Sequence, residues 1–235
     1  MKKKFVIGLL LSIFLASFGL VGSAGATAVS STITLNTFVG STLLMGDKAL
    51  AGVSAVITDT GTATLIGLGD FSLTTFSQPN NPGFIITAPM QVEAFGEQDL
   101  KLSFVVTVLP GGAPITDVSL NFVGGVFPTS NPEAAASIVE TVWTKNPILG
   151  GAFLGYISIG ANGTSYTPFG SVSFAPQKSI FVTKDISVNG DASYGGSAFI
   201  SEITQQFSEV PVPPSLLLFA PGLLGLVGLR KRFFG

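Results

Sequence analysis

The sequence predicts an all-β protein: an antiparallel β-sandwich, jelly-roll-like, with one apolar helix at each end of the chain. Three observations predict it. Apolar and polar residues alternate with a period of two over much of the chain, turn sequences separate these stretches, and both termini carry a continuous apolar segment. This period places every second side chain on the same face of a strand, so one face of each predicted strand is buried.

The N-terminal segment has the three parts of a secretory signal peptide. Three lysines precede a long apolar stretch, and small residues follow it. Ala24 and Ala26 fit the small-x-small cleavage rule, with a cut before Thr27, and Ala26-Thr27-Ala28 offers a second cleavage site. Residues 1–26 are therefore predicted to be a signal peptide for export. The alternative is an uncleaved membrane anchor.

Residues 27–209 are predicted to form one β-sandwich domain, because no repeat or long linker divides them. The clearest strand is 100–108, where leucine, phenylalanine and valine occupy every second position. Other strands are predicted at 54–58, 63–68, 84–87, 91–95, 115–123, 152–159, 171–175, 180–188 and 197–207.

Turn sequences separate these strands at 79–83, 110–114, 162–163 and 189–190. The last two are Asn-Gly pairs, which favour type I′ hairpin turns because both central residues need a positive φ. One segment, 130–136, departs from the strand pattern. Its asparagine N-cap, following proline and early glutamate predict a short helix or helical turn, which gives way to a strand around 138–143.

The charge of the predicted domain excludes one class of partner. It carries five lysines and all thirteen acidic residues of the chain, which makes it clearly acidic, and it has no basic cluster. Nucleic acids are bound through lysine and arginine, so no nucleic-acid partner is predicted. The chain also has no cysteine, so the stability of the domain must come from core burial and sheet pairing.

The absence of histidine and cysteine excludes several kinds of catalytic site. A Ser-His-Asp triad, a cysteine nucleophile and a His/Cys zinc site cannot be built. No metal and no cofactor are predicted. The remaining carboxylate group of Glu93, Glu97 and Asp99 has two interpretations: a glycosidase pair, or a polar loop between two strands with Gly96 at its tip. The loop is the favoured interpretation.

Two further motifs have ordinary structural explanations. Segment 185–191 has oxygen ligands at alternate positions, but the glutamate of a calcium loop is replaced by Gly196, so a strand entering a turn is favoured. Asn162-Gly163-Thr164 fits a glycosylation acceptor and equally a hairpin tip, which is favoured. Sugar-binding faces use exposed tryptophan and tyrosine, and the domain offers Trp143 and three tyrosines.

The C-terminal tail, 210–235, contains three consecutive parts. A proline-containing motif consists of Val210, Pro211, Val212, Pro213, Pro214 and Ser215. The apolar segment 215–229 would reach roughly 22 Å as a helix, which is short for a bilayer span. The basic tip consists of Arg230, Lys231 and Arg232, which the positive-inside rule keeps in the cytoplasm.

At these residues the tail resembles the PEP-CTERM sorting signal, which exosortases recognise in Gram-negative bacteria that make exopolysaccharide. The family motif has glutamate where this chain has Val212. The resemblance implies export, transient tethering to the inner membrane by the C-terminal helix, removal of the tail by an exosortase, and delivery to the cell surface or extracellular matrix. It implies nothing uniform about the domain that carries the tail.

The predicted function is therefore that of an exported, non-enzymatic protein sorted by its tail, with an exosortase as processing partner and exopolysaccharide as a further partner. Three alternatives stay open: a surface glycan-binding adhesin, a secreted glycosidase, and a permanently anchored single-pass membrane protein.

Overall fold

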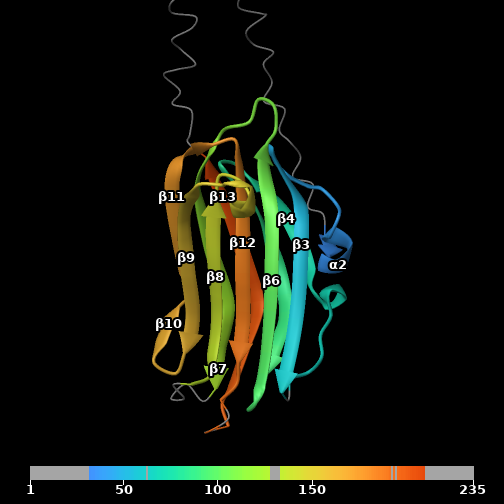
Figure 1. Ribbon diagram of the computed structural model, residues 1–235, viewed down its shortest axis with the longest axis vertical. Coiled ribbons are helices and arrows are strands. Elements are labelled where there is room, and N and C mark those ends of the chain that lie inside the picture. Colours follow the sequence, from blue (N-terminus) through green and yellow to red (C-terminus); the bar gives the residue numbers. More distant parts are fainter. Residues whose placement is uncertain (1–31, 62, 128–132, 192, 194, 210–235) are drawn as a thin grey trace, which may run out of the picture.

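The structure, a computed structural model, describes residues 32–61, 63–127, 133–191, 193 and 195–209. These residues form two antiparallel sheets that stack face to face (Figure 1). The predicted all-β sandwich is therefore confirmed. The predicted signal helix and C-terminal helix lie outside the described residues.

Each sheet mixes strands from distant parts of the chain. The six-stranded sheet contains, in spatial order, β1 (Thr32–Thr34), β4 (Ser72–Gln78), β5 (Asn81–Val92), β13 (Ser197–Glu209), β7 (Ile115–Phe127) and β11 (Phe169–Gln177). The seven-stranded sheet, which faces the viewer in Figure 1, contains β10 (Ser165–Thr167), β9 (Phe153–Asn162), β8 (Ala135–Trp143), β12 (Ser179–Asn189), β6 (Gly96–Val108), β3 (Lys48–Gly61) and β2 (Leu43–Met45).

Over the described residues, helical structure is confined to short connections: α2 (Leu35–Phe38) and the 3-10 turns η1 (Leu68–Asp70) and η2 (Pro147–Leu149). None of the helices in the described part of the chain is long and apolar enough to cross a membrane.

Aromatic and aliphatic side chains from both sheets fill the space between them. The Phe84 ring of the six-stranded sheet meets the Phe104 ring of the seven-stranded sheet edge-on, with centroids 5.5 Å apart. Phe207 packs against Phe84 at 6.2 Å. The alternation predicted for 100–108 is confirmed, because every second side chain from Leu100 to Val108 is buried and those between them are not. Burial of such side chains supplies most of the favourable free energy of folding.

Three local predictions were wrong. Residues 63–67 are irregular and η1 begins at Leu68, because Asp70 Oδ2 accepts the Gly67 N–H at 2.8 Å and closes a turn. In the segment 130–136, β8 already begins at Ala135, where pairing with β9 and β12 outweighs the local helix signal. Residues 128–132 lie outside the described residues.

The third error concerns the Asn-Gly turns, since neither 162–163 nor 189–190 has a residue with positive φ. A hairpin does form at the first pair, between β9 and β10. Its turn is held by the Asn162 side chain, whose Oδ1 accepts the backbone N–H groups of Thr164 at 2.9 Å and Ser165 at 2.8 Å. An asparagine turn of this kind needs no left-handed residue.

Candidate functional site

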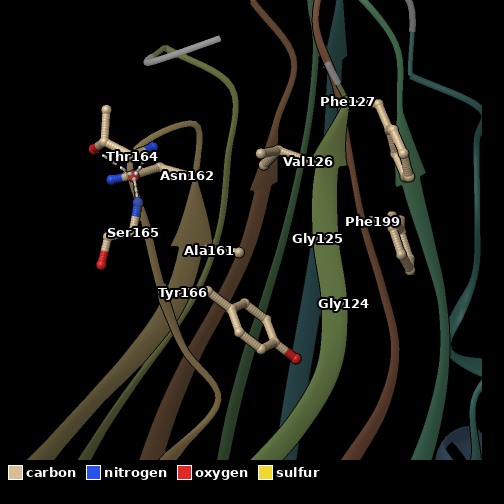
Figure 2. A pocket seen from close by; sticks show the side chains of 10 residues that line it. All are labelled: Gly124, Gly125, Val126, Phe127, Ala161, Asn162, Thr164, Ser165, Tyr166 and Phe199. Carbon is tan, nitrogen blue, oxygen red and sulfur yellow. Dashed lines mark hydrogen bonds between the residues drawn. The ribbon is translucent and has the colours of Figure 1, made fainter. Parts of the chain in front are cut away.

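The pocket in Figure 2 lies where the β9–β10 hairpin of one sheet approaches β7 and β13 of the other. It measures about 420 Å³ and is lined by Gly124–Phe127, Ala161, Asn162, Thr164–Tyr166 and Phe199. This volume falls in the range of small-molecule sites. Of the described residues that line the pocket, none carries a charged side chain.

Aromatic rings stand on both sides of a strand segment without side chains. In Figure 2 the glycine pair 124–125 of β7 lies between the Tyr166 ring on one side and the rings of Phe127 and Phe199 on the other. The two phenylalanine rings stack 6.2 Å apart, and Tyr166 packs against Phe122 at 5.9 Å. A Cβ added to Gly124 would stand 2.5 Å from the Phe199 carbonyl oxygen, so this position accepts only glycine.

One edge of β7 is open toward this pocket. Pairing between β11 and β7 extends only to Phe169 opposite Asn121, whereas β7 continues to Phe127. Within the described part of the chain, the last residues of β7 therefore pair with β13 alone. The pocket combines flat aromatic faces, amide and hydroxyl groups of the hairpin, and the edge of a strand. These groups suit a neutral ligand rich in hydroxyl groups.

Trp143 lies on a different surface, the outer face of the seven-stranded sheet. Its ring meets Phe153 edge-on at 5.0 Å, and its Nε1 donates a hydrogen bond to Thr141 Oγ1 at 3.0 Å. The strand register places Phe153, Trp143 and Phe181 in one cross-strand row. Tyr156 and Thr141 lie opposite each other in the next row. This face is a second surface on which a sugar ring could stack.

The carboxylates weighed as a glycosidase pair lie on and beside β6. Glu93 is in the turn before β6, while Glu97 and Asp99 are alternate residues on its outer face. The loop interpretation was correct for Glu93, but β6 already begins at Gly96, so the other two acids belong to a strand. Asp99 pairs with Lys101 at 3.3 Å.

Asp99 also interacts with Asp185 of β12, which lies directly opposite Lys101 in the strand register. Burial raises the pKa of Asp185, and a hydrogen bond with Asp99 and the Asp99 charge raise it further, against the opposing charge of Lys101. Segment 185–191 begins as a strand, as the favoured interpretation of this motif predicted. Among the described residues, no group of three His, Cys, Asp or Glu could hold a metal ion.

Two lysines are buried in the sandwich, and the sequence analysis singled out neither. Lys184 of β12 lies between the sheets, where its Nζ donates hydrogen bonds to Glu140 Oε2 of β8 and Gln205 Oε1 of β13. Gln205 Nε2 donates to the Ser119 carbonyl oxygen at 3.0 Å and to Glu140 Oε1 at 3.4 Å. Burial raises the pKa of Glu140 and lowers that of Lys184, and their mutual attraction offsets this only in part.

The second lysine, Lys48, lies at the rim where β13 ends. Its Nζ contacts Asp47 and Glu209 at 2.5 Å each and donates to the Ala113 carbonyl oxygen at 3.0 Å. Burial raises the pKa of Asp47, but the hydrogen bonds of Lys48 and Glu209, the Lys48 charge and the Ala113 N–H lower it by more. Burial also raises the pKa of Glu209, and the neighbouring Asp47 raises it further, which outweighs Lys48. Glu209 is therefore the acid that takes up a proton first.

The sorting motif 210–215, the basic tip 230–232 and the cleavage residues Ala24 and Ala26 all lie outside the described residues.

Comparison with known proteins gives weak structural similarities alone. No family model and no curated protein matches the chain. A structure of TmCBM61 in complex with β-1,4-galactotriose has a TM-score of 0.31 and 14% identity, covering 66% of this chain and 88% of that one. A CBM4 structure has a TM-score of 0.26 and 5% identity over 57% of this chain and 75% of that one.

The family 11 xylanase from Neocallimastix patriciarum has a TM-score of 0.24 and 7% identity, over 65% of this chain and all of that one. At TM-scores this low, none of these similarities establishes a function for the chain.

Proposed function

We propose that the chain is an exported, non-enzymatic protein that its C-terminal tail sorts to the cell surface or the exopolysaccharide matrix. In this proposal residues 1–26 direct export and are removed. The helix 215–229 tethers the protein to the inner membrane, and an exosortase reads the motif that begins at Val210 and removes the tail.

One structural observation supports this proposal: the folded domain closes directly before the motif. The last residue of β13, Glu209, donates its N–H to the Asn80 carbonyl oxygen at 3.0 Å and forms an ion pair with Lys48. Because β13 lies inside the six-stranded sheet, its pairing with β5 and β7 is complete at this point. A cut at or beyond Val210 therefore leaves the described hydrogen bonds of the sandwich intact.

The test is the C-terminal peptide of the mature protein from its native host, measured by mass spectrometry. We expect an end within 210–215 for the parent chain. A variant with Pro211→Ala and Pro213→Ala should keep its full tail and stay in the membrane fraction, whereas Pro168→Ala, a substitution away from the motif, should be processed normally. An intact parent peptide that reaches Gly235 would contradict the proposal and favour the permanently anchored alternative.

A second function, binding of a neutral glycan, is favoured by the pocket in Figure 2. Its aromatic faces, hairpin amide and uncharged lining are the groups that bind sugar rings and their hydroxyls. Affinity electrophoresis in neutral polysaccharide gels tests this function. Retardation that Tyr166→Ala abolishes and Trp143→Ala preserves assigns binding to the pocket, and the reverse assigns it to the outer face. A parent chain that no gel retards would contradict both.

The glycosidase alternative is tested in the same preparation. Hydrolysis of a polysaccharide by the parent chain that disappears in Glu93→Gln or Glu97→Gln would support it. We expect no hydrolysis.

A further inference from the structure

Three polar side chains meet in the middle of the core, each from a different strand. Lys184 comes from β12 and Glu140 from the neighbouring β8, whereas Gln205 comes from β13 in the opposite sheet. The exposed fractions of Glu140 and Gln205 are 0% and that of Lys184 is 2%. The contact between Lys184 Nζ and Gln205 Oε1 therefore crosses from one sheet to the other.

Each group in this cluster has a distinct chemical capacity. Lys184 carries a nitrogen nucleophile as soon as it loses its proton, and the carboxamide of Gln205 is an acyl group with ammonia as leaving group. Glu140 contacts both, with Oε2 on Lys184 Nζ and Oε1 on Gln205 Nε2 at 3.4 Å. Deep burial favours the neutral forms of an acid and an amine, so it favours proton transfer from the lysine to the glutamate.

We propose that Lys184 and Gln205 become joined by an isopeptide bond that the chain forms in its own core, with Glu140 as the residue that transfers the protons. The Lys184 nitrogen attacks Cδ of Gln205, and a new C–N bond forms as the carbonyl electron pair moves to Oε1. Glu140, protonated by the Lys184 ammonium before the attack, gives this proton to Nε2 and takes up the second proton from the attacking nitrogen. The bond between Cδ and Nε2 then breaks as the carbonyl re-forms, and Glu140 is left protonated. One amide is exchanged for another, ammonia leaves, and no oxidant or reductant is needed.

The surroundings of the cluster favour this reaction. The Ser119 carbonyl oxygen accepts a hydrogen bond from Gln205 Nε2 at 3.0 Å and fixes the plane of the carboxamide. The fold holds nucleophile and acyl group together, which replaces a bimolecular encounter. Exclusion of water prevents competing hydrolysis.

The cluster around Lys48 shows what the reaction requires. Lys48 is equally buried, but its Nζ contacts two carboxylates and a backbone carbonyl rather than a side-chain amide. With these partners, the Lys48 amine forms salt bridges and has no carboxamide to attack. Lys184 is thus distinguished by the carboxamide beside it.

Intact mass spectrometry of the purified full chain tests the proposal. The parent chain should be lighter than its sequence by one ammonia molecule, whereas Lys184→Arg and Glu140→Gln should have their full calculated masses. Lys101→Arg, an exposed lysine on the same sheet, is the matched control and should still lose ammonia. A parent chain at full mass, or a Lys184→Arg variant that still loses ammonia, would overturn the proposal.

Peptide mapping locates the bond and excludes other losses of ammonia, such as succinimide formation at Asn-Gly. Trypsin should fail to cut after Lys184, and cleavage after Glu202 and Glu209 should leave the peptide 203–209 attached to the peptide that contains Lys184. Separate, unmodified peptides would overturn the proposal. A linked pair that has lost water and joins Lys184 to Glu140 would also overturn it, because the acyl partner would then be the acid.

Discussion

The two buried lysines show how the position of a charge in a β-sandwich determines its consequence. Lys48 lies at the rim with two carboxylates, whose side chains are 31% and 11% exposed. Lys184 lies between the sheets with one carboxylate, and both side chains of that pair are completely buried. Because the carboxylates around Lys48 are partly hydrated, their ion pairs with Lys48 hold the end of β13 in place. Complete burial of Lys184 and Glu140 makes their ionised forms energetically costly and favours proton transfer between them.

Substitution of Lys184 by alanine should have the largest effect on stability. Removal of one partner of a buried pair costs about 3–5 kcal/mol. In a chain that has formed the isopeptide bond this ion pair no longer exists, and loss of the covalent link across a loop of this length costs about 3 kcal/mol instead. Urea denaturation should therefore show a Lys184→Ala chain that is about 3–5 kcal/mol less stable than the parent. Lys101→Ala, the exposed control on the same sheet, should stay within about 0.5 kcal/mol of the parent. A Lys184→Ala loss below about 1 kcal/mol would contradict the assignment of Lys184 to the core.

Lys48→Met should have a smaller effect, which depends on pH. The substitution leaves Asp47 and Glu209 side by side without their cation, at a cost of about 2 kcal/mol near neutral pH because both acids keep some contact with water. The lowered pKa of Asp47 supplies stability above the unfolded value of 3.8, and this stability is lost as the pH falls through the folded pKa.

The raised pKa of Glu209 acts in the opposite sense, since it lowers stability as the pH rises from 4.5 through the folded pKa. The difference between Lys48→Met and the parent should therefore be large at neutral pH and shrink at an acidic pH below the folded pKa of Asp47, where both carboxyl groups are protonated. Urea denaturation at the two pH values measures this. An equal difference at both would contradict the role of Lys48 as a partner of these acids.

Much of this comparison could have been predicted from the sequence, because the strands follow a period of two. In 180–188 the inward positions are isoleucine, valine, Lys184, isoleucine and valine. Glu140 and Gln205 likewise interrupt apolar faces of their strands. A polar residue on a buried face is a signal that the sequence analysis did not use. Which of them meet could not be predicted, since sheet order and the facing of β12 and β13 depend on the whole topology.

The pocket in Figure 2 was harder to predict from the sequence. The hairpin tip at Asn162 was predicted correctly, and Tyr166 was counted among the tyrosines. The approach of Tyr166 to the glycine pair of β7 could not be predicted, because these residues are about forty positions apart and belong to different sheets. The strand missed at 72–78 and the false one at 63–68 have a local cause, because Gly67, Gly69 and Asp70 favour a capped turn over continued pairing.

The smallest effect on stability is expected for Asp185→Asn, which changes a pair of acids, Asp185 and Asp99, on the surface rather than in the core. Burial, and then the hydrogen bond and charge of Asp99, raise the pKa of Asp185 above 3.8. The folded state thus holds this proton more tightly, so stability falls as the pH rises from 3.8 through the folded pKa.

Substitution of Asp185 by asparagine removes this pH dependence of stability. Above that window, Asp185→Asn should be more stable than the parent by a few tenths of a kcal/mol, because an exposed pair is screened by solvent. Thermal unfolding across this pH range measures it, with Glu97→Gln, a substitution of an exposed acid on the outer face of β6, as the control. A variant less stable than the parent at neutral pH would mean that Asp185 acts mainly as the partner of Lys101, and that charge repulsion with Asp99 is not the dominant interaction on this face.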